Sequence, residues 1–226
     1  MQVLWDDGER IFCRESRLGV EGDRNVLIAR PAAEQPPPGC IDRLAHEFSL
    51  KDELNSSWSV RPLEMVRDGT RMQLVLEDPG GEPLVQLLNV PMDTAIFLPL
   101  AVSIASALGK LHQCGLVHKD IKPSHILVNC TDGQARLTGF GLASRLPRER
   151  QAPETLAGTL AYMAPEQTGR MNRSIDSRCD LYSFGVTLYQ MLTASLPFTA
   201  PDPMEWVHCH IAKKPLSPRE RVASVP

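Results

Sequence analysis

Several features of secreted, zinc-binding and membrane-spanning proteins are missing from this chain of 226 residues. Its six cysteines show no C-x-x-C spacing, which argues against a zinc site or a disulfide framework and for reduced thiols. The N-terminus carries Asp6, Asp7 and Glu9 where a signal peptide would carry an apolar segment. The longest mostly apolar run, residues 95–109, contains Pro99 and falls short of the ~20 residues that span a bilayer. These absences predict a cytoplasmic chain without a membrane segment.

Neither charge nor repetition indicates a specialised binding partner. The formal net charge of −3 is near neutral, so it gives no sign of nucleic acid or an anionic membrane as a partner. The sequence contains no internal repeat and no low-complexity tract. With 42% hydrophobic and 23% charged residues, the composition is that of a folded chain that buries a core. The length suits one large domain or two small lobes.

The first third of the chain has the pattern of a small antiparallel β-sheet. Strand-like runs at residues 2–5 and 10–14 flank an Asp-Gly turn, which is a hairpin signal. Apolar positions on one helical face predict a helix over residues 41–54, after a proline-rich connector. Further strands are expected over residues 25–30, 60–66 and 72–76. Together these elements predict a small lobe over residues 1–76, followed by a breaker-rich hinge over residues 77–82.

Residues 83–226 have a mainly helical pattern. Strand-like runs at residues 126–128 and 135–138 flank a Thr-Asp-Gly turn inside this part. Helices are expected near residues 83–88 and over residues 94–114, 180–192 and 202–211. The fold class expected is therefore α+β, with a small antiparallel sheet lobe and a mainly helical lobe.

Three blocks in the helical part resemble the active-site motifs of protein kinases. Residues 116–127 read Leu-Val-His-Lys-Asp-Ile-Lys-Pro-Ser-His-Ile-Leu, residues 137–141 read Leu-Thr-Gly-Phe-Gly, and residues 163–166 read Met-Ala-Pro-Glu. They resemble the catalytic loop H-R-D-x-K-x-x-N, the D-F-G motif and the A-P-E motif, in the same order. The resemblance implies a bilobal protein-kinase-like fold.

The kinase resemblance covers nearly the whole chain, and some segments carry a narrower one. Residues 136–154, 167–173 and 202–211 are similar to the N-terminal serine/threonine kinase-like domain of large bacterial signalling proteins, which join it to an AAA-type ATPase region, a GAF sensor and a histidine kinase. That resemblance implies ATP-dependent phosphorylation of a protein substrate, ATP and Mg²⁺ as cofactors, and adjacent domains of the same polypeptide as partners. It also implies a truncated helical lobe, because a kinase helical lobe would continue past residue 226.

The resemblance assigns roles to individual motif residues. Asp120 would be the catalytic base, and Lys122 would lie beside the transferred phosphoryl group. His118 would pack beneath Phe140, and Asp180 would hold the catalytic loop by backbone hydrogen bonds. A role for Asp120 as a simple turn cap ranks lower, because its neighbours also match the motif. The remaining motif residues expected to be structural are Gly141 and Glu166.

The metal positions depart from the kinase pattern. Gly139 stands at the D-F-G Asp and offers no ligand, and His125 stands at the catalytic-loop Asn. Mg²⁺ prefers oxygen ligands, whereas imidazole suits zinc, copper or nickel. The degenerate ATP and Mg²⁺ positions are therefore Glu47, Glu77, Lys122, His125 and Gly139.

The phosphate-binding positions depart as well. A turn with three carboxylates, Asp6, Asp7 and Glu9, replaces the glycine-rich loop and would repel a nucleotide triphosphate. Ala29 stands at the strand lysine, and Arg30 would face the other side of the strand. Glu47 could be the helix glutamate of the usual ion pair, but its partner, the strand lysine, is then missing. A solvated or hydrogen-bonded Glu47 is an equal alternative to that role.

For two basic or histidine-rich runs, simple structural roles are favoured over binding sites. Arg145, Arg148 and Arg150 could bind a phosphate, but solvation is favoured. His208 and His210 flank a cysteine, and adjacent helical positions do not face one another, so packing and surface roles are favoured over a metal site. Two functions remain open: a phosphotransferase that uses Asp120 and Lys122 with an unusually held metal, or a pseudokinase that binds partners. Weak or absent phosphoryl transfer is the expectation.

Overall fold

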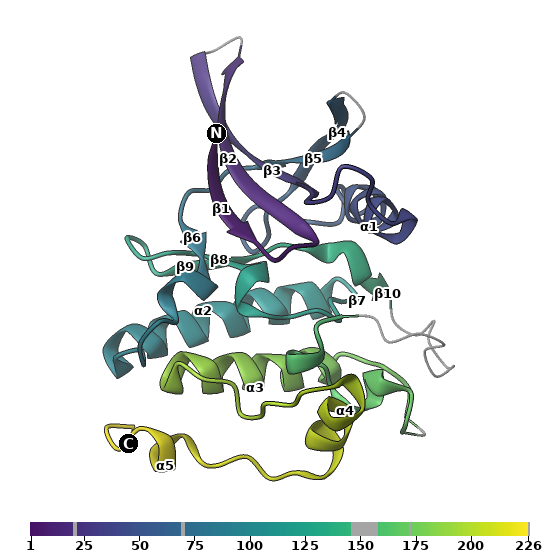
Figure 1. Ribbon diagram of the computed structural model, residues 1–226. Coiled ribbons are helices and arrows are strands. Elements are labelled where there is room, and N and C mark those ends of the chain that lie inside the picture. Colours follow the sequence, from purple (N-terminus) through teal and green to yellow (C-terminus); the bar gives the residue numbers. More distant parts are fainter. Residues whose placement is uncertain (20–21, 69–70, 146–157, 172, 226) are drawn as a thin grey trace.

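The computed structural model describes residues 1–19, 22–68, 71–145, 158–171 and 173–225, and it has a sheet-rich lobe above a helical lobe (Figure 1). The sheet has the order β1-β2-β3-β5-β4, and all neighbouring strands are antiparallel. The α+β bilobal fold expected from the sequence is therefore confirmed. The strands are β1 (Gln2–Asp6), β2 (Arg10–Gly19), β3 (Gly22–Pro31), β4 (Pro62–Asp68) and β5 (Arg71–Glu77).

The β1–β2 turn is held by its own aspartates. Gly8 has a φ of +84°, a left-handed conformation that favours glycine. Asp6 Oδ1 accepts the Gly8 N–H at 2.8 Å, and Asp7 Oδ1 accepts the Arg10 N–H at 2.7 Å. These side-chain hydrogen bonds replace backbone turn bonds, which is how Asx residues stabilise turns. The predicted hairpin forms, and it aims the turn at the lower lobe (Figure 1).

Helix α1 (Pro38–Ser49) lies against the sheet, but its bounds differ from the prediction of residues 41–54. It begins within the proline-rich stretch because proline is compatible with the first turn of a helix, where its missing N–H needs no partner. Leu44 packs into the sheet core with Leu27 and Leu74, and Phe48 packs beside them. The helix thus presents its polar residue Glu47 to the space between the lobes.

Several contacts join the lobes. In the hinge, Arg14 Nε donates to Asp78 Oδ2 at 2.6 Å and Arg14 Nη2 donates to the Gly81 carbonyl at 2.7 Å. A Cβ on Gly81 would lie 2.3 Å from the carbonyl oxygen of Val128, so only glycine permits this close approach. The backbone of Leu137 also bonds to the small lobe, where it donates to the Trp58 carbonyl at 2.9 Å.

The lower lobe is built around two long helices, α2 (Thr94–Gln113) and α3 (Arg178–Thr193). Among the described helices, α2 alone is long and apolar enough to cross a bilayer, and one face of it packs into the core through Ile104, Leu108 and Leu111. The other helices are α4 (Pro203–Ala212), α5 (Pro218–Arg221) and the 3₁₀ turns η1 (Leu84–Leu87), η2 (Pro123–His125), η3 (Phe140–Leu142), η4 (Leu160–Tyr162) and η5 (Pro165–Thr168). The strands of the lower lobe are β6 (Glu82–Pro83), β7 (Leu116–Val117), β8 (Ile126–Asn129), β9 (Gln134–Leu137) and β10 (Ser144–Arg145).

Candidate functional site

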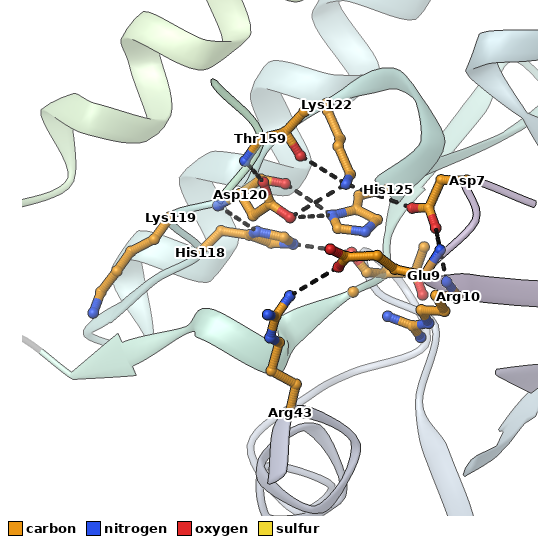
Figure 2. A network of polar contacts seen from close by, with 12 residues as sticks. Asp7, Glu9, Arg10, Arg43, His118, Lys119, Asp120, Lys122, His125 and Thr159 are labelled. Carbon is orange, nitrogen blue, oxygen red and sulfur yellow. Dashed lines mark hydrogen bonds and ion pairs between the residues drawn. The ribbon is translucent and has the colours of Figure 1, made fainter. Parts of the chain in front are cut away.

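The loop between β7 and β8 brings a carboxylate, an ammonium and a hydroxyl together (Figure 2). Lys122 Nζ lies 3.5 Å from Asp120 Oδ2 and donates to Thr159 Oγ1 at 2.8 Å. The Thr159 N–H donates to Asp120 Oδ1 at 2.9 Å. The structure therefore places the two residues that the sequence assigned to catalysis side by side, and Thr159 binds to both of them.

Asp120 is held as a carboxylate. Burial raises the pKa of Asp120, but its polar neighbours, which include the positive charge of Lys122 and the Thr159 N–H, lower it by more, so the net pKa is below the usual range. A carboxylate with a lowered pKa is a weak base. It is suited to orienting a hydroxyl group by hydrogen bonding rather than to removing its proton completely.

Asp180, at the start of α3, fixes the backbone of this loop. Its carboxylate is fully buried and accepts the N–H groups of His118 at 2.9 Å and Lys119 at 2.8 Å. His112 Nε2 donates to the same carboxylate at 2.9 Å. Three donors around one buried carboxylate offset the cost of burying its charge. This is the geometry that the resemblance assigned to Asp180.

His118 links the first motif to the second. Its Nε2 donates to the Thr138 carbonyl at 3.0 Å, and its Nδ1 accepts the Asp120 N–H at 3.3 Å. The ring centroid lies 4.9 Å from that of Phe140, which is fully buried and also meets Trp58 edge-on. The contact between His118 and Phe140 is the one that the resemblance implies.

His125 occupies the space in front of Gly139. A Cβ on Gly139 would lie 2.7 Å from Cγ and Cδ2 of His125, closer than real Cβ atoms approach. Gly139 also has a φ of +80°, so its backbone conformation is one that most side chains avoid. An aspartate at position 139 is therefore incompatible with the observed place of the His125 ring.

The imidazole of His125 is neutral and has a fixed tautomer. Its Nδ1 donates to the Asp120 carbonyl at 2.8 Å, so Nε2 carries the lone pair. Burial, followed by the positive charge of Lys122, lowers the pKa of His125 well below its ordinary value. His125 thus contributes a nitrogen acceptor and no charge.

These residues do not fit Mg²⁺. The ion requires several oxygen ligands at about 2.0–2.1 Å in octahedral geometry. One family ligand is replaced by a glycine and the other by an imidazole that packs on that glycine. The described residues also contain no group of three or more His, Cys, Asp or Glu side chains placed to hold a metal. The place of the missing metal-binding aspartate is thus filled by the ring of His125.

The β1–β2 turn lies over the loop, and its carboxylates face cations that a phosphate would use (Figure 2). Asp7 Oδ2 lies 4.0 Å from Lys122 Nζ. Glu9 Oε2 lies 3.5 Å from Arg43 Nη1 on α1. The acidic turn therefore brings negative charge to the place where a nucleotide triphosphate would carry its own.

The usual strand lysine partner of Glu47 is absent, as the sequence indicates, but a different cation takes its place. Arg10 Nη2 on β2 lies 3.2 Å from Glu47 Oε2, and the Glu47 side chain is fully buried. Glu47 Oε1 accepts the Gly139 N–H at 3.1 Å. The solvated alternative for Glu47 is excluded by its burial, and the hydrogen-bonded one is observed.

Arg30 is not that partner. It lies beside Cys13 on the outer face of the sheet, where burial raises the pKa of the Cys13 thiol and Arg30 partly opposes the rise. Ala29 faces the opposite way, in the core with Phe12 and Leu44. The strand alternation predicted from the sequence is therefore present, and the lysine position of β3 is apolar.

The space beneath β1 and β2, next to the hinge, is closed by apolar side chains. Leu4 and Phe12 of the sheet pack in one buried cluster with Leu127 of the lower lobe. A cavity of only about 70 Å³ remains near the catalytic loop, whereas small-molecule sites usually measure ~300–1,000 Å³. Its lining includes Asp7, Arg10, Arg43, Asp120, Lys122 and His125.

Glu77 is not part of this cavity lining. Its carboxylate accepts the Ser56 hydroxyl at 2.5 Å, and its N–H donates to the Arg61 carbonyl at 2.9 Å. The structure thus gathers four of the five degenerate cofactor positions, Glu47, Lys122, His125 and Gly139, and leaves Glu77 at the hinge.

The structure describes part of the arginine-rich run and the histidine-rich run considered above. Arg145 is exposed and pairs with Glu53 at 2.7 Å, whereas Arg148 and Arg150 lie outside the described residues. His210 is buried, accepts the Tyr182 hydroxyl at 2.7 Å on Nδ1, and donates through Nε2 to the Leu160 carbonyl at 2.7 Å. His210 is therefore a packing residue that joins α3 and α4 to the η4 turn.

Sequence reasoning missed two parts of the site, Arg10 and the apolar closure by Leu4 and Phe12. Arg10 and Arg14 have the same parity along β2, so alternation alone cannot say which one meets Glu47. A hydrophobic residue in a strand next to the turn is equally compatible with a ligand pocket and with a closed core. Both features depend on contacts between distant segments.

Comparisons with known proteins identify the family. Residues 29–221 match the protein kinase domain model. The serine/threonine-protein kinase pkn2 of Myxococcus xanthus is 32% identical over 192 residues, which cover 82% of this chain and 23% of the relative. PknB of Mycobacterium leprae is 30% identical over 152 residues, 66% of this chain and 24% of that protein. A probable serine/threonine-protein kinase of Clostridium acetobutylicum is 33% identical over 190 residues, 82% of this chain and 28% of that protein.

The chain thus spans between 23% and 28% of the length of these curated relatives. All three relatives are named as serine/threonine kinases and come from bacteria. Together with the bilobal fold and the loop that carries Asp120, Lys122 and Asp180, the match shows that this chain belongs to the protein kinase domain family.

Proposed function

We propose that this serine/threonine kinase domain is a pseudokinase, a folded module that regulates or binds a partner without efficient Mg²⁺-dependent phosphoryl transfer. The observation that carries the proposal is the packing of the His125 ring against Gly139, which fills the place of a metal-binding aspartate. Phosphoryl transfer in this fold depends on metal ions that bridge the phosphates and neutralise developing charge. Loss of both protein ligands at one place removes that support.

The state of the nucleotide cleft supports the same proposal. The buried cluster that contains Leu4, Phe12 and Leu127 closes the space between sheet and lower lobe. Asp7 lies 4.0 Å from Lys122 and adds a like charge where phosphates would lie. ATP would have to separate this cluster and displace a carboxylate before it could bind, which predicts weak binding.

One observation favours a second candidate function, an ATP:protein phosphotransferase of low activity. Asp120, Lys122 and Thr159 keep hydrogen-bonding geometry around an ionised carboxylate. That arrangement could still orient a substrate hydroxyl group. The two candidates differ in one requirement, since only the phosphotransferase needs ATP to bind productively next to Asp120.

The partner of the pseudokinase is proposed to be another domain of the same polypeptide. The resemblance to large signalling proteins suggests an ATPase or sensor region, and the curated relatives are several times longer than the part that this chain matches. A kinase fold that no longer turns over ATP can pass conformational changes between such domains through its two lobes. Signal transduction within one chain is the role that this arrangement supports.

Calorimetric titration with ATP, with and without Mg²⁺, tests the proposal. The unmodified chain is expected to show weak binding that Mg²⁺ does not strengthen. The double variant His125→Asn, Gly139→Asp restores the family residues and serves as the matched positive control, in which Mg²⁺ is expected to strengthen binding. Tight Mg²⁺-dependent binding by the unmodified chain would overturn the pseudokinase proposal and favour the phosphotransferase.

A further inference from the structure

We propose that Arg10 is a positioning residue, the cation that fixes Glu47 and, through Glu47, holds the Gly139–Leu142 segment in place without any nucleotide. Protein kinases use a lysine on the third strand to pair with the helix glutamate. In this chain the cation comes from the second strand, one residue after the acidic turn. The inference does not depend on whether the domain transfers phosphate.

The pair is buried and self-contained. Arg10 Nη2 lies 3.2 Å from Glu47 Oε2, with the Glu47 side chain fully buried and the Arg10 side chain 22% exposed. Both atoms are buried, and neither has a hydrogen-bond partner among the described residues, so the contact between them is an ion pair. A buried carboxylate without a cation would be strongly unfavourable, so Arg10 is the partner that compensates for the burial of Glu47 inside the cleft.

Glu47 passes this constraint to the second motif. Its other oxygen, Oε1, accepts the Gly139 N–H at 3.1 Å. Gly139 precedes η3, whose Phe140 is fully buried against His118 and Trp58. Arg10, Glu47 and Gly139 thus form one polar chain from β2 through α1 to the motif segment.

A second contact makes α1 and this segment one unit. His46, the neighbour of Glu47, donates through Nε2 to the Ala143 carbonyl at 2.6 Å. Gly141 packs so closely on Arg43 that a Cβ would lie 2.8 Å from Arg43 Cβ. Loss of the Arg10 pair should therefore loosen α1 and residues 139–143 together, as one local opening.

The β-sheet explains why this position can replace the usual one. Arg10 pairs with Pro31, and Phe12 pairs with Ala29, so Arg10 lies one step along the inner face from the position of the absent lysine. Phe12 and Ala29 both face the core between sheet and α1. An arginine side chain is long enough to reach α1 from there, and its guanidinium is well suited to a carboxylate.

Hydrogen–deuterium exchange on the unmodified chain and on Arg10→Ala, without nucleotide, tests the proposal. Exchange in α1 and in residues 139–143 should rise by about tenfold or more, the change expected when one partner of a buried ion pair is removed. Exchange in α3 should stay unchanged. Arg10→Lys, which keeps the charge, should recover part of the protection, a result that a purely space-filling role would not give.

Arg14→Ala is the matched control. It removes another partly buried β2 arginine, one that pairs with Asp78 in the hinge, so it should not change exchange in α1 or residues 139–143. Should Arg10→Ala fail to fold, Glu47→Gln gives the same test, because it removes the charge that Arg10 binds and keeps the shape. Equal exchange patterns in Arg10→Ala and Arg14→Ala, or a uniform rise that includes α3 in Arg10→Ala and Glu47→Gln, would overturn the proposal.

Discussion

The ring of His125 fills the space in the active-site cleft where a side chain on Gly139 would lie. The first replaces the catalytic-loop Asn and the second the D-F-G Asp, and the ring atoms lie only 2.7 Å from where a Gly139 Cβ would be. The two replacements are therefore sterically dependent. Restoring the family residue at one position without the other should be unfavourable.

Gly139→Asp alone should destabilise the domain by roughly 1–3 kcal/mol, because it overpacks the cleft against His125. With His125→Asn present, the same substitution should cost less than half as much. Urea unfolding of both single variants and the double variant would measure the coupling. Additive changes in the free energy of unfolding would contradict the steric account.

Asp180→Ala should lower the free energy of unfolding by about 3 kcal/mol or more, because it leaves the buried N–H groups of His118 and Lys119 without an acceptor. The matched control is Asp176→Ala, which removes a partly exposed carboxylate paired with the exposed Arg178 and should change stability by about 1 kcal/mol or less. Denaturant unfolding separates the two. Similar losses in both variants would show that Asp180 does not hold the loop.

The domain should lose stability on mild acidification. Burial lowers the pKa of His210 below its usual value of 6.5, although the Leu160 carbonyl partly opposes this, and burial lowers the pKa of His125 well below the same value. Between the folded pKa and 6.5 the unfolded chain binds more protons, so stability rises with pH in this window. The free energy of unfolding should therefore fall as the pH is lowered from about 7.5 to about 5.5.

His210→Gln checks the source of that pH dependence. Glutamine keeps a donor and an acceptor for Leu160 and Tyr182 but does not titrate. Its unfolding free energy should depend less on pH over the same range, with His125 responsible for the slope that remains. An unchanged slope in this variant would exclude His210 as a contributor.

The acidic turn should weaken binding of polyanions. Asp7→Asn together with Glu9→Gln should strengthen binding of ATP by roughly tenfold, because removal of two like charges near a phosphate is worth about 1–2 kcal/mol at a partly exposed site. Fluorescence titration with a labelled ATP at low and high salt would measure it. Glu53→Gln, which removes a carboxylate paired with Arg145 of β10 and absent from the cavity lining, is the control. An effect of equal size in the control would remove the turn from the account.

The sequence predicts the fold because the decisive signals are local. Asp-Gly between two strand runs gave the first hairpin, and helical periodicity gave α2 and α3. The start of α1 was wrong because a proline-rich stretch reads as a connector, whereas proline also suits the first turn of a helix. Such ambiguities are resolved by packing against the sheet and not by residue preference.

The site was only partly predictable for the same reason. Asp120 and Lys122 stand two residues apart in a recognisable motif, so the sequence places them together. The Arg10–Glu47 pair and the His125–Gly139 contact join separate elements, and no local pattern marks them. The third strand has no cation that faces Glu47, whereas the adjacent strand supplies one.

Transfer of radiolabelled phosphate from ATP, with Mg²⁺ present, tests the central claim most directly. The unmodified chain and Asp120→Ala would be compared for labelling of themselves and of a general protein substrate. If the domain is a pseudokinase, both should show the same background labelling, because the filled metal position and the closed cleft would prevent productive binding of ATP. Labelling by the unmodified chain that disappears in Asp120→Ala would contradict it and identify the domain as an active kinase.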